Sequence, residues 1–216
     1  MDYRTEEEQL EALKNWWKKN GGSLLVGVAL ALAIVFGWKG WQNHQANQRA
    51  AAASHFNDML DALNNDDSKK RMSSMDFIAS QMRKDYGSSV YTVFANLLMA
   101  KEQVQQKQFD KALDSLSWAQ KHVGEKDPLR LVVDERLARA QFAANKPDAA
   151  LNTLQEIKDP GSFAASYKEL EGDILKSQGK TSEAIAAYKA ARKAAGDTPS
   201  PILDLKLSDL AGAEGS

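Results

Sequence analysis

The sequence predicts an all-α protein in which a single N-terminal transmembrane helix is followed by an α-solenoid of degenerate helix pairs. Three observations support this fold class: one long uncharged apolar run near the N-terminus, a helix-forming composition after it, and an internal repeat. Of the 216 residues, 43% are hydrophobic and 26% are charged, which is typical of a globular chain. The net charge of −1 argues against nucleic acid as a partner, and the lack of cysteine excludes disulfides and thiolate chemistry.

The first element is an uncharged run over residues 21–38, with the sequence GGSLLVGVALALAIVFGW. As a helix it would be about 27 Å long, close to the thickness of about 30 Å of a bilayer core. Trp16 and Trp17 precede the run, and Trp38 and Trp41 follow its apolar part, so aromatic rings lie at both expected membrane interfaces. We therefore expect a membrane anchor. The expected division of the chain is a leader at 1–20, the anchor at 21–41 and an outer domain at 42–216.

Two other interpretations of the run are weaker. A core helix of this length would show a polar face and would not carry paired tryptophans at its ends. A cleaved signal peptide would begin with a short basic region, whereas the segment 1–20 that precedes this run is long and rich in acidic side chains. Lysine and arginine are more frequent on the N-terminal side, which favours a cytoplasmic N-terminus. In a bacterium the outer domain would then lie in the periplasm.

The leader at 1–20 is expected to be helical. Thr5 and Glu8 have the spacing of a capping box. Leu10, Leu13 and Trp17 follow at intervals of three and four residues, which places them on one helix face. Two interpretations stay open, an interfacial helix that contacts lipid or a membrane partner, and a solvated leader into the anchor.

The outer domain is rich in Ala, Leu, Gln, Lys and Glu, and this composition favours helices over strands. Proline and glycine mark the expected boundaries: Pro128 and Pro201 at helix starts, and Gly124, Gly179 and Gly196 at helix ends. The expected helices are 42–64, 68–84, 88–107, 109–123, 128–144, 147–157, 162–177, 181–194 and 201–210.

An internal repeat relates the helices of this domain. The stretches 108–119, 146–157 and 180–191 align so that an alanine of each stretch coincides with an alanine of the other two. A large residue follows four positions later in each, and a small residue precedes by twelve. We expect the small residues of a pair to face each other, so that its two helices approach closely. The aligned sets are Ala112, Ala150 and Ala184; Leu116, Leu154 and Tyr188; Ala100, Ala138 and Gly172.

The repeat resembles the tetratricopeptide repeat, with a small residue, an alanine twelve later, and a large residue four beyond. Three units cover about 93–195, an irregular helical pair precedes them, and 201–210 is expected to cap the array. The pattern departs from the repeat where an aromatic residue is usual near the start of each first helix. Asn96, Asp134 and Lys168 stand there instead.

In such arrays the first helix of each pair lines a groove, which makes this surface the candidate protein-binding site. The groove mixes apolar side chains with charges of both signs, and so suits an extended or helical polypeptide better than an anion. The alternative interpretation is that the same residues are ordinary exposed helix positions. The candidate groove residues are Leu97, Lys101 and Val104 in the first unit, Glu135, Arg139 and Phe142 in the second, and Glu169, Asp173 and Lys176 in the third.

Catalytic patterns are missing from the sequence, so we expect no enzyme, no cofactor and no metal. His44, His55 and His122 form no recognised metal motif, although His44 and His55 are about three helical turns apart. The pair Asp66 and Asp67 before Ser68 indicates a turn and a helix N-cap. A basic cluster suggests either acidic phospholipid binding or, as the stronger interpretation, a solvated face balanced by nearby aspartates. Its members are Lys69, Lys70, Arg71, Arg83 and Lys84.

The overall layout resembles the family of ancillary SecYEG translocon subunits from end to end. The most specific part of the resemblance is the order of short motifs around the anchor. An acidic leader, a pair of aromatic residues and an Asn-Gly precede the anchor, and a Gly-Trp and a Trp-x-x-His-Gln motif follow. The matching residues are Trp16, Trp17, Asn20, Gly21, Gly37, Trp38, Trp41, His44 and Gln45. The resemblance implies a single-pass protein of the bacterial inner membrane with a periplasmic domain. Its implied partners are the SecYEG translocon, a membrane-anchored periplasmic chaperone of the prolyl-isomerase type, and client polypeptides. The resemblance also implies a link to envelope-stress signalling. The alternative function is a scaffold or regulator of another cell-envelope complex.

Overall fold

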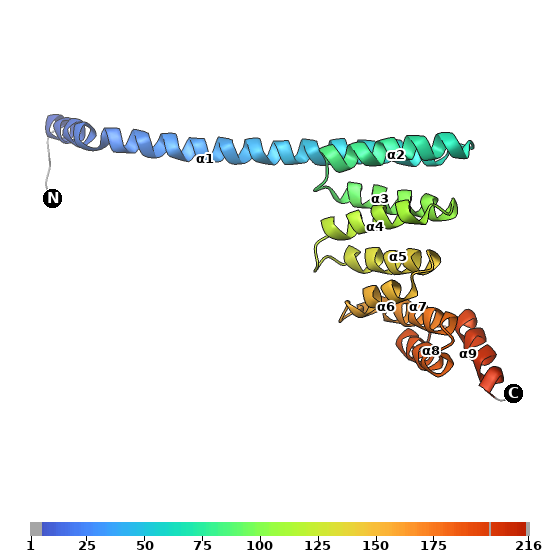
Figure 1. Cartoon of the computed structure of the whole chain (residues 1–216). Helices are drawn as coiled ribbons and strands as arrows, with labels where there is room; N and C mark the ends of the chain where they lie inside the picture. Colours follow the sequence, from blue (N-terminus) through green and yellow to red (C-terminus); the bar gives the residue numbers. More distant parts are fainter. Residues whose placement is uncertain (1–5, 199, 215–216) are drawn as a thin grey trace. The chain divides into compact units, whose positions relative to one another are not determined.

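The computed structural model describes residues 6–198 and 200–214, and within these residues the protein is helical and contains no strand (Figure 1). The all-α fold class is therefore confirmed. The chain divides into two compact units, residues 1–51 and 52–216. The helices are α1 Glu6–Leu63, α2 Ser68–Asp85, α3 Val90–Gln105, α4 Phe109–His122, α5 Leu129–Ala143, α6 Pro147–Gln155, the short 3-10 helix η1 Gly161–Phe163, α7 Ala164–Ser177, α8 Thr181–Ala195 and α9 Pro201–Glu214.

Helix α1 joins three segments that the sequence separates. The expected leader helix, the anchor and the helix expected over 42–64 form one uninterrupted helix to Leu63. No proline interrupts residues 6–63, and the stretch after the anchor is rich in alanine and glutamine, which favour continuation of the helix. Thr5 of the expected capping box lies outside the described residues.

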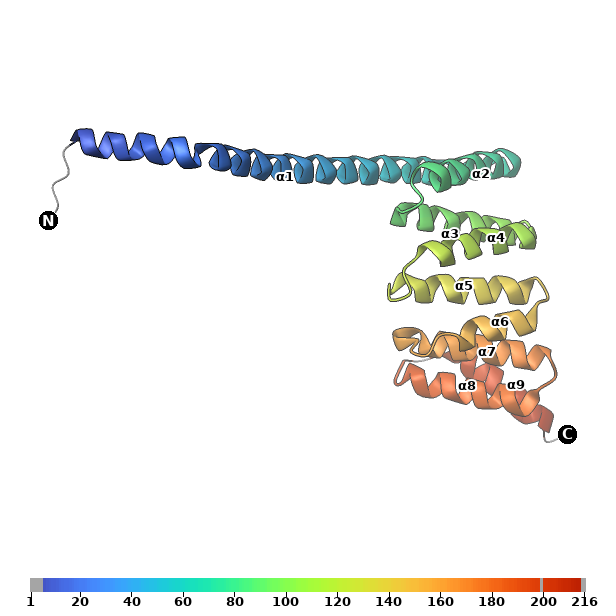
Figure 2. The same cartoon turned by 60° about the vertical axis from the view of Figure 1, so that its left-hand side comes forward.

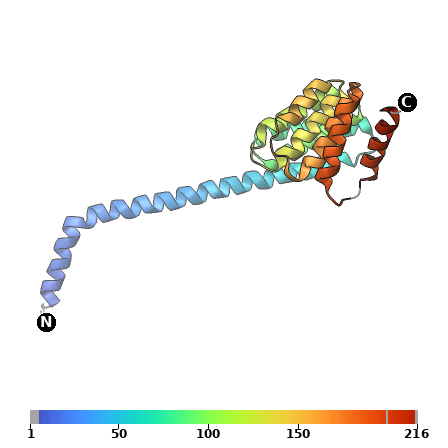
Figure 3. The same ribbon diagram turned by 90° about the horizontal axis from the view of Figure 1, so that it is seen from below.

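The N-terminal part of α1 bends (Figure 3). This part of α1 contains Gly21 and Gly22, which lower the local helix propensity. Asn20 donates a side-chain hydrogen bond to the Trp16 carbonyl at 3.1 Å. A side chain at Gly21 would place its Cβ 3.1 Å from the Trp17 ring, so this tryptophan lies directly over the glycine.

The apolar run is the only segment in the described residues that is long and apolar enough to cross a membrane. Its mean hydropathy is 2.1 over an 18-residue window, and only 6% of that window is buried. Leu30 and Ile34 are 60% and 72% exposed. These exposures contradict the alternative in which the run forms a core helix of the protein.

The second unit begins where α1 first contributes to a core. Ala52 and Met59 are completely buried, and Met59 packs with Met75 and Met82 of α2 and Met99 of α3. This first core belongs to the irregular helical pair that precedes the repeats.

Three helix pairs then stack on one another: α3 with α4, α5 with α6, and α7 with α8 (Figures 1 and 2). The aligned alanines Ala112, Ala150 and Ala184 are all fully buried, as the repeat predicts. At Gly172, however, the expectation that small residues face each other is wrong in detail. The closest atoms to a Cβ at this position belong to the Tyr188 ring, whose Cδ1 would be 2.5 Å away, rather than to Ala184.

The two helices of each pair are joined by the same left-handed turn. Lys107, Asn145 and Gly179 have φ values of 58°, 59° and 75° at equivalent positions. After each of them a backbone N–H returns to a carbonyl five residues earlier, at 2.7, 2.9 and 3.0 Å. The pattern is that of a helix C-terminus closed by a residue in the αL region. Each of the three residues precedes the aligned alanine of its unit by the same number of positions, so the turn is part of the repeat.

Most expected boundaries agree with the structure within one or two residues. Asp67 is the N-cap of α2, and its carboxylate accepts from the backbone N–H groups of Lys69 and Lys70. At the start of α5 the prediction is one residue early: Pro128 precedes the helix, and Asp127 accepts from the Leu129 N–H at 2.9 Å. The last helix extends to Glu214 instead of ending at residue 210.

Candidate protein-binding groove

The candidate groove residues occupy equivalent positions on the first helix of each pair. Leu97, Lys101 and Val104 lie on α3, and the corresponding residues of the second and third units lie on α5 and α7. Helix α3 contacts α5, and α5 contacts α7, so the three first helices are neighbours along the stack. The structure thus aligns the nine residues on successive helices, but their surroundings differ from unit to unit.

Between the first and second units the surface is hollowed. An open cavity of about 280 Å³ lies between α3 and α5, with α4 behind it. Its lining is apolar at the floor and basic or amidic at the rim. The lining residues are Leu97, Ala100, Lys101, Val104, Gln105, Leu116, Arg136, Arg139 and Ala140. We call this feature the α3–α5 hollow.

Four of the nine predicted residues line this hollow: Leu97, Lys101, Val104 and Arg139. Leu97 and Leu116 form the floor of the hollow and belong to the hydrophobic core, since they are only 4% and 2% exposed. An apolar floor with polar groups at the edge is the usual composition of a binding pocket.

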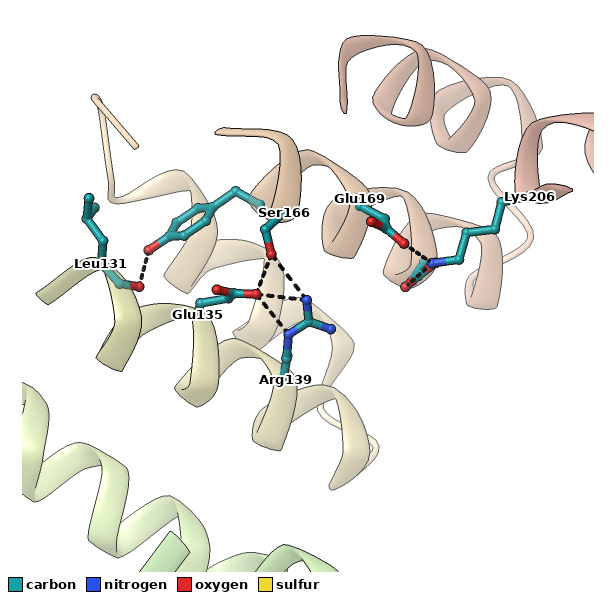
Figure 4. A network of polar contacts seen from close by, with 8 residues as sticks. Leu131, Glu135, Arg139, Ser166, Glu169 and Lys206 are labelled. Atoms are coloured by element: carbon teal, nitrogen blue, oxygen red, sulfur yellow. Dashed lines mark hydrogen bonds and ion pairs between the residues drawn. The ribbon is translucent and has the colours of Figure 1, made fainter. Parts of the chain in front are cut away.

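A polar cluster fixes the edge of the hollow on α5. Glu135 accepts hydrogen bonds from Arg139 Nε at 3.0 Å and Nη2 at 2.8 Å, and it also accepts from the Ser166 hydroxyl (Figure 4). The Glu135 side chain is only 15% exposed, whereas Arg139 is 50% exposed. All three hydrogen bonds end on Oε1 of Glu135, and the ion pair orients Arg139 at the edge of the hollow.

In the third unit, two of the three groove residues are bonded to a lysine of α9. Lys206 on α9 donates to Glu169 at 2.7 Å and to Asp173 at 2.9 Å, both on α7 (Figure 4). The Tyr188 hydroxyl donates to Asp173 at 2.8 Å, and the Lys206 ammonium lies 5.7 Å from the Tyr188 ring centroid. Leu203 and Leu210 of α9 are buried in the core of the third unit, and α9 packs mainly against α8, so it closes this end of the stack.

The charges in this cluster stabilise one another. Burial alone would lower the pKa of Lys206, but its hydrogen bonds to Asp173 and Glu169 outweigh burial and raise the pKa above the usual value. Burial also raises the pKa of the Tyr188 phenol, and the hydrogen bond to Asp173 raises it further. The cluster therefore holds a cationic lysine and a neutral tyrosine against the two carboxylates.

The two remaining predicted residues have other roles. Phe142 is partly buried and packs against the core of the third unit. Lys176 is exposed near the end of α7. Sequence reasoning missed Arg136 and Gln105 at the rim, and Lys206 on α9. Arg136 is the residue after Glu135, so a prediction that included the neighbours of the groove positions would have found it. Lys206 lies outside the repeats, so no repeat position predicts it.

The basic cluster seen in the sequence contains arginines with structural partners. Arg71 pairs with the buried Glu102 at 3.1 Å, and Arg83 donates to Asn96 at 2.6 Å and to Asp114 at 2.9 Å. These arginines join α2 to the first repeat. Their partners lie on α3 and α4 and not among the neighbouring aspartates of the sequence, whereas Lys69, Lys70 and Lys84 are exposed.

The histidines do not assemble a metal site. His55 lies 3.4 Å from Asp58 and its ring contacts Tyr86, and His122 stacks on Trp118 with 3.8 Å between ring centroids. Within residues 6–198 and 200–214, no group of three or more metal-ligating side chains comes together.

Taken together, an apolar N-terminal helix and three stacked helix pairs define a helical-repeat protein with a candidate membrane anchor. The family model of the tetratricopeptide repeat-like domain matches residues 14–212. Similar proteins include the ancillary SecYEG translocon subunits of Haemophilus influenzae, 31% identical over 97% of this chain and 100% of the relative, and of Escherichia coli, 30% identical over 96% and 98%. That of Aggregatibacter actinomycetemcomitans is 31% identical over 97% and 100%. The chain belongs to the family of ancillary SecYEG translocon subunits with a tetratricopeptide repeat-like domain.

Proposed function

We propose that this chain is a non-enzymatic, membrane-anchored interaction scaffold ancillary to the SecYEG translocon. The similarity that carries this proposal extends over nearly the whole chain and includes the apolar part of α1 as well as the repeats. The α3–α5 hollow supports a binding role because it combines an apolar floor with exposed charges. Anchoring beside the channel raises the effective concentration of the repeats near membrane-bound partners, so a modest direct affinity suffices.

The finer part of the proposal concerns topology and partners. The N-terminus lies in the cytoplasm and the repeats lie in the periplasm of the bacterial inner membrane, in agreement with the excess of Lys and Arg before the anchor. The repeats link the channel to a membrane-anchored chaperone of the prolyl-isomerase type and to emerging envelope proteins. A reporter that functions only in the periplasm should be active when fused after Ser216, and activity of a cytoplasmic reporter there would refute this orientation.

Crosslinking in intact membranes tests the partners. The native chain should crosslink both to the channel and to the chaperone. The double variant Lys101→Glu, Arg139→Glu should keep the channel contact, which the anchor supplies, and lose most of the chaperone contact. The matched control is Lys69→Glu, Lys70→Glu, which reverses two exposed charges on α2, outside the hollow. If the hollow variant captures the chaperone as well as the control does, the hollow is not the docking surface. If the native chain crosslinks to neither partner, only a scaffold of another envelope complex is left.

A further inference from the structure

We infer that the N-terminal part of α1, residues 6–20, lies along the membrane surface as an amphipathic helix with its apolar face inserted into the lipid. We call residues 6–20 the N-terminal arm. The partner of the arm is the surface of the bilayer in which the anchor sits. The inference rests on the proposed function only for the statement that the apolar part of α1 spans the membrane. Two observations carry it, the apolar face of the arm and the direction in which α1 bends.

The arm has one apolar face, and this face is exposed. Leu10, Leu13 and Trp17 follow one another at intervals of three and four residues, and Trp16 lies beside them. These four residues are 51–62% exposed, although burial of such large side chains is strongly favoured. The opposite side of the arm is polar and has residues at the same kind of spacing: Glu7, Glu11, Asn15 and Lys18.

Helix α1 curves toward one side where the arm meets the anchor (Figure 3). A hollow runs along a single side of the helix there, which a straight helix does not form. Its lining extends from the arm into the anchor and consists of Trp16, Asn20, Ser23, Leu24, Gly27, Val28 and Ala31. Two side-chain hydrogen bonds to backbone carbonyls lie at the same place, from Asn20 to Trp16 at 3.1 Å and from Ser23 to Asn20 at 2.8 Å. Bonds of this kind accompany bends in helices. The hollow therefore marks the inner side of the bend.

The apolar face of the arm and the inner side of the bend coincide. Leu13 precedes Trp16 and Asn20, which line the hollow, by three and seven residues, so the three residues share one helix face. When a helix spans a membrane and its arm turns aside at the surface, the lipid fills the angle between the two. The bend thus turns Leu13 toward lipid and the polar side with Glu11 and Asn15 toward water. A leader that stayed in solvent would not require this agreement.

Burial of apolar surface, rather than attraction to charged headgroups, holds the arm in place. Residues 6–20 contain four glutamates and three lysines, so the arm has no excess of positive charge for anionic lipid. An amphipathic helix inserts its apolar face about 5–10 Å into the boundary between headgroups and acyl chains, where tryptophan is also favoured. Because the anchor keeps the arm at the surface, a weak intrinsic affinity for lipid suffices. An arm in this position keeps the anchor from sliding through the membrane and from rotating about its own axis.

Site-specific labels test the position of the arm. The chain contains no cysteine, so one introduced cysteine carries the only label. The full-length variants Leu13→Cys and Asn15→Cys place a nitrobenzoxadiazole fluorophore on the two faces of the arm, and Leu30→Cys places it in the anchor as a reference. Each protein is reconstituted at low density into phosphatidylcholine vesicles. Quenching is measured with nitroxide-labelled lipid and with iodide present on both sides of the membrane.

We expect the label at position 13 to be quenched by the nitroxide lipid and to be several times less sensitive to iodide than the label at position 15. Adding phosphatidylglycerol should not change this difference, because burial and not charge causes it. With the label at position 13, the changes Leu10→Asn and Trp17→Asn should restore most of the iodide quenching. The matched control is Glu7→Gln, Glu11→Gln on the polar side, which should leave iodide quenching low.

The other outcomes overturn the inference in different ways. Equal iodide quenching at positions 13 and 15 would mean that the arm is solvated, or that it needs a protein partner that pure lipid vesicles lack. Protection that appears only with phosphatidylglycerol would mean that charge holds the arm. Protection at position 13 from both quenchers that disappears on further dilution of the protein in lipid would mean that a second copy covers the face.

The label at position 30 separates this inference from the proposed function. If position 30 is in lipid while position 13 is in water, the arm is not at the membrane surface and the anchored scaffold stands. If iodide quenches the label at position 30, the segment is not a membrane anchor, and the proposed anchoring and the inference both fail.

Discussion

The contact between Gly172 and Tyr188 makes the repeat packing directly testable. A Cβ at Gly172 would lie 2.5 Å from Cδ1 of the Tyr188 ring. Carbon atoms in contact are normally about 3.5–4.0 Å apart, so the Gly172→Ala variant requires a shift of about 1 Å. The ring cannot easily supply it, because Tyr188 is fully buried and its hydroxyl is bound to Asp173.

The expected magnitude follows from two opposing terms. Overpacking of a filled core costs about 1–3 kcal/mol, and the confined ring favours the upper part of that range. Replacing glycine by alanine in a helix returns about 1 kcal/mol of backbone propensity. We therefore expect Gly172→Ala to destabilise the domain by about 1–2 kcal/mol, and Gly172→Leu to destabilise it by more.

The measurement is denaturant unfolding of the full-length protein in detergent, followed by circular dichroism. Gly124→Ala is the matched control, because a Cβ at Gly124 meets only the Asp127 Cβ at an ordinary 3.8 Å. In a Tyr188→Leu background, Gly172→Ala should be neutral or stabilising, since the ring that it clashes with is gone. Loss of stability of the same size in both backgrounds would refute the assigned contact.

Three further predictions concern the turns, the buried Tyr188 phenol and the anchor. Lys107→Gly should stabilise the protein by about 0.5–1 kcal/mol, because glycine adopts the positive φ at this position without steric strain. Gly179→Ala should destabilise the protein by about 1 kcal/mol for the same reason. If denaturant unfolding shows a change of the same sign for both variants, the repeated turn is contradicted. Burial raises the pKa of Tyr188 in the folded state, so the free energy of unfolding should fall as the pH rises above about 10, and Tyr188→Phe should weaken that fall when unfolding is measured across this range. Leu30→Arg should weaken membrane insertion by about 2.5–3.5 kcal/mol and reduce carbonate-resistant retention, whereas Leu30→Ile should not; equal retention would mean that another segment anchors the chain.

The sequence is sufficient to predict the helical class, the order of the helices and the repeat, because each rests on local signals. Asp67 and Gly179 mark helix ends through their own side chain or backbone, and Ala112, Ala150 and Ala184 are buried because two helices cross there. These properties depend on residue type and spacing, which a sequence displays directly.

The differences arise where the structure depends on more than local signals. Helix α1 continues past the anchor because residues 42–63 contain no proline or glycine that would end it, so the expected division at residue 42 has no counterpart in the backbone. The Tyr188 ring against Gly172 depends on the approach of α7 to α8, which spacing alone does not give.

The candidate groove also combines features that the sequence predicts with features that it does not. Its nine residues can be placed on the first helices from the repeat register. That α9 contacts the third unit through Lys206 cannot be predicted in this way, because Lys206 lies outside the repeats and its partners on α7 come from a distant part of the sequence. The contact of α9 with these carboxylates is therefore visible only in three dimensions.

Co-purification tests the central claim most directly. The full-length chain, tagged after Ser216 and produced at its native level, is extracted in mild detergent and its associated proteins are identified. The account predicts that the channel subunits of the SecYEG translocon co-elute with the native chain and are lost when the Leu30→Arg change prevents anchoring. Recovery of the native chain without channel subunits would contradict the assignment as an ancillary translocon subunit.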